Sequence, residues 1–268
     1  MTVAILGAGV MGEAVLAGLI AAGHPPQELI VSDGRPERVA ELRERYGVEG
    51  ADNVGAARHA DTILLVVKPQ DIPAVLDDIK NVVGPGQRVV SLAAGVTTAS
   101  IESRLSDGVA VIRVMPNTPA LVAEGMAAIA PGANCSDADL AVAEKLLAVT
   151  GKVVRVSEEQ LDAVTAVSGS GPAYVFLLAE AMTEAGVKLG LPTETASELA
   201  IQTVIGSAKL LKETGEAPQT LRQRVTSPGG TTAAALNSLE EQQLREIFAT
   251  ALESARDRSR ELARGADD

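Results

Sequence analysis

The chain has 268 residues, of which 46% are hydrophobic, and it carries a formal net charge of −12. The hydrophobic fraction is sufficient for a packed core, while the acidic balance argues against nucleic-acid binding, which needs a basic surface. The single cysteine, Cys135, excludes an internal disulfide framework and a cysteine-rich metal site, so we predict that the protein holds no metal.

The most apolar run near the N-terminus, residues 3–23, is interrupted by glycines and Glu13, so we expect no membrane-spanning helix. The N-terminus also lacks the basic region and cleavage site of a signal peptide. The sequence therefore predicts a cytoplasmic protein without a membrane partner. The two histidines, His24 and His59, fall in predicted helix ends or loops, which favours solvent-exposed positions over roles as a base or a metal ligand.

The first predicted element is a strand at Thr2–Leu6, which a glycine-rich turn joins to a helix at Glu13–Ala22. Glycines at this spacing permit a tight turn and a close approach to a pyrophosphate, and the following helix N-terminus offers free N–H groups. A second predicted strand, Leu29–Ser32, places Asp33 about twenty residues beyond the turn, where a ribose contact is expected. The pattern favours dinucleotide binding over a merely tight strand-to-helix turn. The residues of the turn are Gly7, Ala8, Gly9, Val10, Met11 and Gly12.

Strands and helices continue to alternate up to about residue 157, as in a doubly wound sheet. The run Asp61–Val67 is almost continuously apolar, which is typical of a parallel strand covered on both faces. The further predicted helices are at 36–46, after 53, and at 70–80, 98–105 and 136–149, and the further strands are near 48 and at 88–93, 109–114, 126–130 and 152–156.

Beyond Gln160 only helices are predicted, at 172–186, 192–214, 218–225, 231–239 and 240–263. Pro172, Pro192 and Pro218 fall near the first position of a helix, where the missing N–H group is not needed. We therefore predict an α/β protein with a dinucleotide-binding domain at 1–160 and an all-helical domain at 161–268. The second domain is thin and its helices have apolar faces, so we expect at least a homodimer.

Three loops after predicted strands have compositions suited to a ligand, which binds beyond the carboxyl ends of the strands in such sheets. In Val67-Lys68-Pro69 the lysine can meet a phosphate or ribose, or can simply extend along the surface before a helix that begins at the proline. Ala93-Ala94-Gly95 permits close approach of a flat ring or forms a plain turn. Asn117, in a loop with two prolines, can orient a carboxamide or bond to the turn backbone.

Two glycine-rich loops precede helices of the second half, at 167–172 and 226–232, and the second is the better candidate for a ligand. Gly229 and Gly230 free the backbone, so that successive N–H groups can converge on an anion at a helix N-terminus. Thr231 and Thr232 add hydroxyl groups. Such a loop suits a small carboxylate, although it is also compatible with an N-cap that has a flexible entry.

These loops together resemble the pyrroline-5-carboxylate reductase family, and the resemblance covers essentially the whole chain. It rests on Gly7–Gly12, Val67–Pro69, Ala93–Gly95, Met115–Pro119, Ser168–Tyr174 and Thr226–Thr232, of which the last two are the specific ones. The resemblance implies a Rossmann-like sheet and the reduction of Δ1-pyrroline-5-carboxylate to L-proline with NADPH or NADH, the last step of proline biosynthesis. It also implies a helical domain that interlocks with a second subunit, with dimers sometimes forming decamers.

The resemblance assigns roles to individual residues. It implies that Thr232 is the catalytic residue, because it matches the threonine that hydrogen-bonds the ring nitrogen of the substrate. Ser227, Gly230 and Thr231 match the cradle for the substrate carboxylate, and Glu158 falls where the family has an acidic residue near the substrate ammonium group. The implied cofactor contacts are Gly7 to Gly12, Asn53, Val67, Lys68, Pro69, Ala93, Ala94, Gly95 and Asn117.

The end of the second strand, Ser32-Asp33-Gly34-Arg35, departs from the family pattern. The family often has small hydroxyl residues here, which receive a 2′-phosphate. Asp33 favours the free ribose of NADH, although Arg35 and Arg38 can offset its charge. The resemblance predicts NADPH, with NADH as the alternative, and places Asp33, Gly34 and Arg35 among the cofactor-binding residues.

Three other functions compete with this interpretation. A β-hydroxyacid dehydrogenase would need a catalytic lysine in the helical domain, and neither Lys188 nor Lys209 has the surrounding motif. A reductase of another cyclic imine cannot be distinguished by sequence. A non-catalytic nucleotide-binding regulator would not need the anion-binding loop at 226–232.

Overall fold

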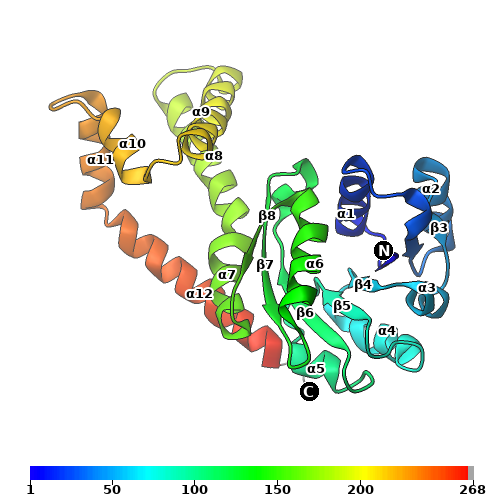
Figure 1. Cartoon of the computed structure of the whole chain (residues 1–268). Coiled ribbons are helices and arrows are strands. Elements are labelled where there is room, and N and C mark those ends of the chain that lie inside the picture. Colours follow the sequence, from blue (N-terminus) through cyan, green and yellow to red (C-terminus); the bar gives the residue numbers. More distant parts are fainter. Residues whose placement is uncertain (265–268) are drawn as a thin grey trace. The chain divides into compact units, whose positions relative to one another are not determined.

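The computed structural model describes residues 1–264 and divides into two compact units (Figure 1). The first unit contains Met1–Gly169 and the described residues from Ala255 onwards, and the second is Ser170–Ser254. The boundary between these units thus lies near Gly169, and the last helical turns group with the first unit. The sequence-based domains, 1–160 and 161–268, stay a prediction.

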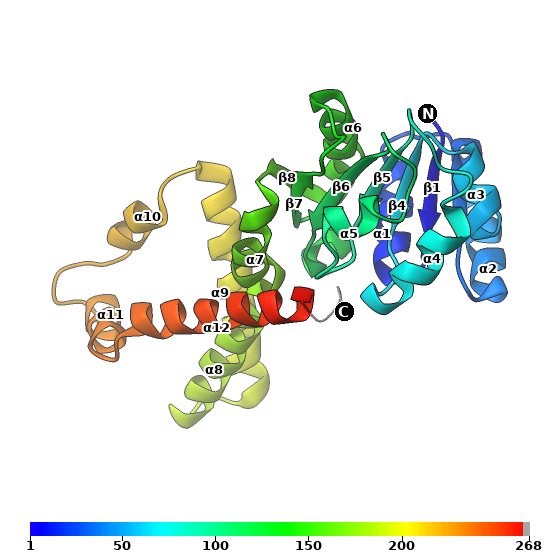
Figure 2. The same cartoon turned by 90° about the horizontal axis from the view of Figure 1, so that it is seen from below.

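The first unit is built on an eight-stranded sheet with the order β3-β2-β1-β4-β5-β6-β7-β8, which can be followed from β1 to β8 in Figure 2. All neighbours are parallel except β6 and β7. The strands are β1 (Val3–Leu6), β2 (Leu29–Ser32), β3 (Glu49–Gly50), β4 (Thr62–Leu65), β5 (Arg88–Ser91), β6 (Ala110–Met115), β7 (Gly125–Pro131) and β8 (Gly151–Arg155).

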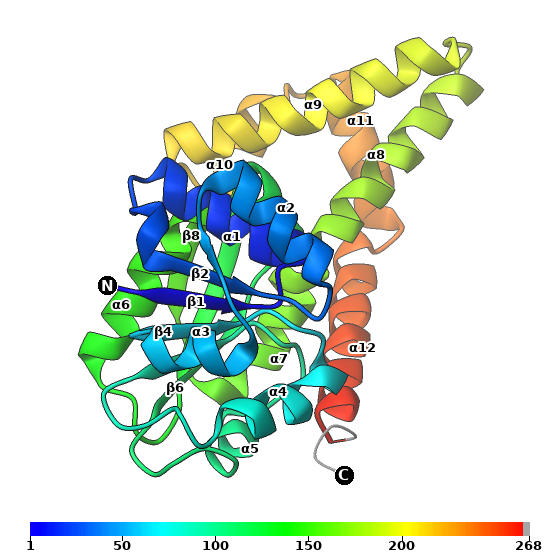
Figure 3. The same cartoon turned by 90° about the vertical axis from the view of Figure 1, so that its right-hand side faces the viewer.

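Helices cover both faces of this sheet, and Figure 3 shows α1 and α2 on one face and α3, α4 and α5 on the other. Side chains of β1 alternate between the two cores, with Val3 and Ile5 in one and Ala4 and Leu6 in the other, because successive strand residues point to opposite faces. The helices are α1 (Val10–Ala21), α2 (Pro36–Tyr46) and α6 (Asp137–Leu147) against the first core, and α3 (Asn53–His59), α4 (Ile72–Ile79) and α5 (Thr98–Glu102) against the second.

The antiparallel direction of β7 was not part of the sequence-based prediction. The connection from β6 to β7, residues 116–124, is too short to carry the chain across the sheet, and a parallel crossover needs a dozen or more residues. The chain therefore returns alongside β6. A short helix, α7 (Leu161–Val164), and a π-helical turn, Thr165–Gly169, then cover β7, where Leu161 packs against Ala128 and Ala130.

The second unit is all helical in the described residues. Gly186 on α8 packs closely against Ala196 on α9, and Tyr174 meets Phe248 edge to face at 6.4 Å between ring centroids. Many large apolar side chains remain exposed, including Phe176 at 65%. The helices are α8 (Gly171–Lys188), α9 (Thr193–Thr214), α10 (Pro218–Arg224), α11 (Thr231–Glu241) and the first part of α12 (Leu244–Arg264).

One helical stretch, Glu158–Lys188, is long and apolar enough to cross a membrane by length and composition. This corrects the expectation that no segment meets those criteria. Residues 163–179 carry no charged side chain. Small residues such as glycine and serine separate the apolar ones, so this stretch does not stand out as a long apolar run. Only 11% of the most apolar part of the stretch is buried, which agrees with the exposed apolar side chains of α8.

A cluster of charged side chains joins α1 to α2. Glu13, in the first turn of α1, is in direct ionic contact with Arg38 and accepts hydrogen bonds from Arg45 at 2.5 Å and from the Tyr46 hydroxyl at 2.9 Å. The hydrogen bond from Arg38 is the main reason that the pKa of Glu13 lies below its ordinary value, and burial opposes it. The cluster fixes the helix that follows the glycine turn.

We predict that Glu13→Gln lowers the free energy of unfolding by about 1–2 kcal/mol at pH 7, because the Arg38 contact loses its charge. Since the folded-state pKa is lowered, this stabilisation is present above the ordinary value of 4.5 and is lost as the pH falls through the folded-state value. Urea unfolding of the unmodified protein and of Glu13→Gln, at pH values from 7 down into the acid range, measures this difference in free energy. Glu37→Gln, at an exposed position, is the control. If the difference in free energy of unfolding does not change with pH, the stabilisation does not come from the charged contact between Glu13 and Arg38.

Candidate active site

The loops predicted to bind a cofactor lie at one edge of the first unit, because the strands that precede them are parallel. Backbone pairing continues one residue past the strand ends. The Gly7 N–H donates to the Ser32 carbonyl at 2.8 Å, and the Val66 N–H donates to the Leu6 carbonyl at 2.8 Å. These bonds hold the ends of β1, β2 and β4 in register where a dinucleotide would lie.

The glycine turn after β1 is shaped by close backbone contacts. Gly7 has φ +98°, and a Cβ atom on it would lie 2.6 Å from the carbonyl carbon and oxygen of Val66. A Cβ atom on Gly12 would overlap the Gly7 carbonyl oxygen. In contrast, a Cβ atom on Gly9 would meet nothing within 4 Å. The turn is therefore closed toward the protein at Gly7 and Gly12 and open at Gly9.

The N-terminus of α1 adds hydrogen-bond donors at this open side. Gly9 is the N-cap and provides no side-chain cap, and the first backbone bond of the helix runs from the Glu13 N–H to the Gly9 carbonyl. Within residues 1–264 no acceptor is bonded to the N–H groups of Val10, Met11 or Gly12. Donors at a helix N-terminus beside an open glycine fit the pyrophosphate of a dinucleotide.

Asp33 follows β2 and is fixed beside the turn. Its Oδ2 accepts the Ala8 N–H at 3.0 Å, and its Oδ1 accepts both the backbone N–H and the Nε of Arg35 at 3.0 Å. Burial raises the pKa of Asp33, but the bonds from Arg35 and Ala8 outweigh it and hold that pKa below its usual value. Asp33 is thus an ionised carboxylate at the predicted ribose position.

The other polar residues predicted to contact the cofactor differ in how they are engaged. The Asn53 side chain accepts a hydrogen bond from the Ser32 hydroxyl at 2.8 Å and donates to Asp78 at 2.9 Å. Lys68 is exposed and caps the short turn Pro69–Asp71 that precedes α4. Lys68 therefore remains available to a ligand, while Asn53 braces the ends of β2 and α4.

Asn117 uses its amide within the first unit. It donates to the Ser168 carbonyl and hydroxyl, each at 3.2 Å, and accepts the Met126 N–H at 2.8 Å. These bonds tie the loop after β6 to the start of β7 and to the π-helical turn. A cofactor contact of Asn117 stays a prediction, and the bonds observed are those of a residue that positions the surrounding loops.

The turn Ala93–Gly95 follows β5, and Ala93 is buried while Ala94 is exposed. Gly95 has φ +77°, and the backbone N of Ala263, in the last turns of α12, would lie 3.7 Å from a Cβ atom at that position. The end of α12 is therefore close to this turn within the first unit. Exposed Ala94 leaves the turn accessible from one side.

Glu158 lies in the first unit and has both carboxylate oxygens engaged. It accepts the Thr98 N–H at 2.8 Å, the Thr98 hydroxyl at 2.5 Å and a guanidinium N–H of Arg113 at 3.2 Å. Arg113 on β6 is only 8% exposed. The predicted contact of Glu158 with the substrate remains a prediction. Its observed bonds fix the start of α5, just after the Ala93–Gly95 turn.

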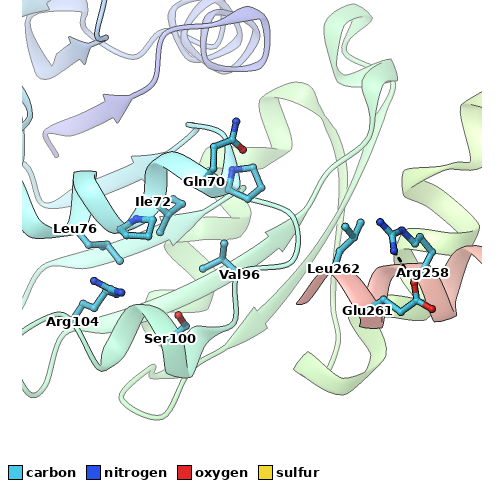
Figure 4. Close-up of a pocket in the computed structure, with 11 residues that line it drawn as sticks. Gln70, Ile72, Leu76, Val96, Ser100, Arg104, Arg258, Glu261 and Leu262 are labelled. Carbon is cyan, nitrogen blue, oxygen red and sulfur yellow. Dashed lines mark hydrogen bonds and ion pairs between the residues drawn. The ribbon is translucent and has the colours of Figure 1, made fainter. Parts of the chain in front are cut away.

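A hollow of about 540 Å³ lies between α4, the segment around α5 and the last turns of α12 (Figure 4). Arg104 lies at the α4 and α5 side, and Arg258 pairs with Glu261 at 2.7 Å on α12. Of the residues predicted to bind ligands, only Pro69 lines this hollow. The hollow thus adjoins the cofactor loops without containing them.

The candidate substrate loop belongs to the second unit, between α10 and α11. Gly229 has φ +72°, the Gly230 N–H donates to the Ser227 carbonyl at 3.1 Å, and a Cβ atom on Gly230 would lie 2.5 Å from the Ser227 hydroxyl. Gly230 caps α11 without a side-chain bond. In the described part of the chain, the N–H groups of Thr231 and Thr232 have no acceptor, so they are free to bind a carboxylate.

The sequence analysis missed three residues that shape this site: Thr98, Arg113 and Asp78. Each acts through a predicted site residue, since Thr98 and Arg113 hold Glu158 and Asp78 holds Asn53. One signal was present for Arg113, because a charged residue inside the apolar strand 109–114 needs a buried partner. The other two had no comparable signal.

Comparison with known proteins gives matches over both halves of the chain. Residues 158–262 match the family model described as pyrroline-5-carboxylate reductase dimerisation, and residues 2–95 match the model described as NADP oxidoreductase coenzyme F420-dependent. A pyrroline-5-carboxylate reductase of Corynebacterium melassecola is 46% identical over 267 residues, which cover 98% of this chain and 99% of the relative.

Solved structures give the same result. The structure of a pyrroline-5-carboxylate reductase from Coxiella burnetii has a TM-score of 0.95 and 39% identity, covering 98% of each chain. The Plasmodium falciparum pyrroline carboxylate reductase, crystallised with NADP bound, has a TM-score of 0.83 and 30% identity, again over 98% of each chain. The similarity therefore extends over the dinucleotide-binding sheet and the helical region together.

We predict that Gly9→Ala raises the Kd of the nicotinamide cofactor at least tenfold, about 1.4 kcal/mol, while the Tm falls only slightly because alanine is a weaker N-cap than glycine. The methyl group has room in the free protein but would occupy the side from which the pyrophosphate is predicted to approach. Fluorescence titration and thermal unfolding measure the two effects. Gly84→Ala, which also adds a methyl group in open space, is the control. Unchanged cofactor affinity in Gly9→Ala would place the pyrophosphate elsewhere.

We predict that Glu158→Gln lowers the free energy of unfolding by about 1–3 kcal/mol, because the buried guanidinium of Arg113 loses its charged partner. Urea unfolding measures this loss. The neighbouring Glu159→Gln, an exposed residue, is the matched control. If Glu158→Gln instead raises the substrate KM more than tenfold without loss of stability, its main role is contact with the substrate.

Proposed function

The chain belongs to the pyrroline-5-carboxylate reductase family, and on that premise we propose how its residues carry out the reaction. It is an NAD(P)H-dependent oxidoreductase that reduces Δ1-pyrroline-5-carboxylate to L-proline, the last step of proline biosynthesis. The observation that carries this function is the full-length similarity to reductases of that name, one of which is 46% identical. The donors at the open side of Gly9 support binding of the cofactor pyrophosphate.

We propose that the loop before α11 binds the substrate carboxylate. Its support is local: free N–H groups at Thr231 and Thr232, and a Gly230 position where a side chain would overlap Ser227. Backbone donors at the N-terminus of an eleven-residue helix stabilise a carboxylate without an arginine. Ser227, Gly230 and Thr231 therefore fix one end of the substrate ring.

We propose that Thr232 positions the ring nitrogen from this same helical turn. When bound, the reduced nicotinamide supplies the hydride. A protonated imine is already electrophilic, so the residues need to orient it and stabilise its charge more than they need to supply a strong base. A threonine hydroxyl can donate or accept a hydrogen bond, which suits a nitrogen whose protonation changes in the reaction.

The chain self-associates through its helical region, which matches the family's dimerisation model. We propose a cytoplasmic homodimer as the smallest assembly, and we propose no role for nucleic acid or for a membrane. The support for the homodimer is the set of large apolar side chains exposed on α8 and α9, such as Phe176, Leu177 and Leu199. A decamer is the larger assembly that the family resemblance implies.

The first test is oxidation of NADH or NADPH, followed at 340 nm, after addition of Δ1-pyrroline-5-carboxylate, with L-proline identified as the product. Six-membered cyclic imines and 2-carboxylates are assayed in parallel. We expect turnover with at least one cofactor and preference for the five-membered substrate. Absence of turnover with both cofactors would overturn the proposed function.

We predict that Thr232→Ala lowers kcat/KM for the imine at least tenfold, whereas Thr232→Ser retains most of it, because serine keeps the hydroxyl. Steady-state kinetics with both variants measure this. Thr226→Ala is the control from the same loop, since the Thr226 hydroxyl is already engaged as the donor of a 2.6 Å hydrogen bond to the Arg222 carbonyl. An unchanged kcat/KM in Thr232→Ala would remove Thr232 from the mechanism.

A further inference from the structure

The residue at the end of β2 lies where a dinucleotide presents the 2′ position of its adenosine ribose. NADH carries a hydroxyl group there and NADPH a phosphate. We propose that Asp33 makes this chain selective for NADH over NADPH. The inference rests on the proposed function only in taking a nicotinamide dinucleotide to lie along Gly7–Gly12.

The position of the Asp33 carboxylate is fixed by the turn that holds the pyrophosphate. Its Oδ2 accepts the Ala8 N–H at 3.0 Å, and Ala8 lies between Gly7 and Gly9 in that turn. The Asp33 side chain is only 11% exposed, so it cannot turn away to accommodate a larger group. A ligand bound along the turn therefore meets a carboxylate at a set position.

A carboxylate oxygen has two lone pairs. Asp33 Oδ1 already accepts two hydrogen bonds from Arg35, whereas Oδ2 accepts only the Ala8 N–H and retains one lone pair for a further donor. A ribose hydroxyl can donate to Oδ2. A 2′-phosphate carries negative charge and offers mainly hydrogen-bond acceptors. The Asp33 carboxylate would therefore repel a phosphate placed where it would bind the ribose hydroxyl. Since the pKa of Asp33 lies below its usual value, the carboxylate stays ionised throughout the neutral range.

The cations near Asp33 are already paired. Arg35 forms an ion pair with Asp33 itself at 3.0 Å. Arg38 donates its Nε to the Ala8 carbonyl at 2.9 Å and pairs with Glu13 and Glu41, and its side chain is only 14% exposed. To bind a 2′-phosphate, Arg38 would have to leave two carboxylates and a buried carbonyl.

Arg45 extends the same arrangement, since it pairs with Glu13 at 2.5 Å and with Glu41 at 2.6 Å. The guanidinium groups of Arg38 and Arg45 are thus paired with carboxylates of α1 and α2 and are not free to pair with a phosphate. Of Arg35, Arg38 and Arg45, only Arg35, with 59% of its side chain exposed, can move toward the ribose without breaking the pairs with Glu13 and Glu41. Such a movement would leave the Asp33 charge uncompensated, which again disfavours a phosphate.

The test measures cofactor binding and turnover in the full-length protein. The chain has no tryptophan, so the fluorescence of NADH and NADPH can be titrated without that background. We expect the Kd of NADH to be at least tenfold lower than that of NADPH. We also expect kcat/KM to be higher with NADH than with NADPH. Because repulsion between charges is screened by salt, the difference should narrow as ionic strength rises.

Two variants separate charge from shape. Asp33→Asn keeps an acceptor for the Ala8 N–H and removes the charge, and Asp33→Ser also removes the bulk. We expect both to lower the Kd of NADPH at least tenfold and to raise the Kd of NADH severalfold. Glu37→Gln, an exposed residue of the same helix turn as Arg38, removes an equal charge and should leave the ratio of the two affinities unchanged.

The outcomes separate this inference from the proposed function. The proposed role of Asp33 in selecting NADH would be overturned by either of two results. One is equal or tighter binding of NADPH by the unmodified protein, and the other is an unchanged ratio of NADH to NADPH affinity in both Asp33 variants. Turnover of the imine in such a protein would leave the proposed function intact. Selective binding of NADH without turnover of any imine would instead support the role of Asp33 in cofactor selection and contradict the proposed reaction.

Discussion

The close contact between Gly7 and the backbone of Val66 is the constraint on which the first unit depends. It brings the turn after β1 against the end of β4 at a distance that excludes any side chain. The contact sets the direction in which α1 begins, and with it the donors at Val10 and Met11. Asp33 follows from the same arrangement, because its carboxylate is bonded to Ala8 within the turn. The proposed cofactor binding and the proposed cofactor choice therefore have one structural origin.

Much of this fold could be predicted from the sequence, because parallel strands buried on both faces leave a clear pattern. The strand Leu29–Ser32 and the helix Pro36–Tyr46 were predicted with the bounds that the structure has. The direction of β7 was missed, because it follows from the short connection at 116–124 and not from apolar patterning, which identifies a strand but not its partner. The π-helical turn before α8 was also missed, because Ser168 and Gly169 favour a loop, and residues 167–172 were predicted as one.

The candidate site shows a similar limit. Sequence placed Asn53, Asn117 and Glu158 at the ligand-binding edge, yet all three use their side chains on other residues of the chain. A polar residue at a strand end is equally suited to binding a ligand and to bracing a loop, and only its partners distinguish the two roles. Asp33 is the reverse case: its residue type raised the question of cofactor choice, and its contacts explain why the charge stays in place.

The apolar side chains exposed on the second unit make the stability of the folded protein dependent on its concentration. Phe176 and Leu177 are 65% and 64% exposed, and the proposed homodimer would remove such side chains from water. The free energy of folding then includes a term for association, and dilution shifts the equilibrium toward separate chains by mass action. The stability of the folded chain should therefore depend on its concentration.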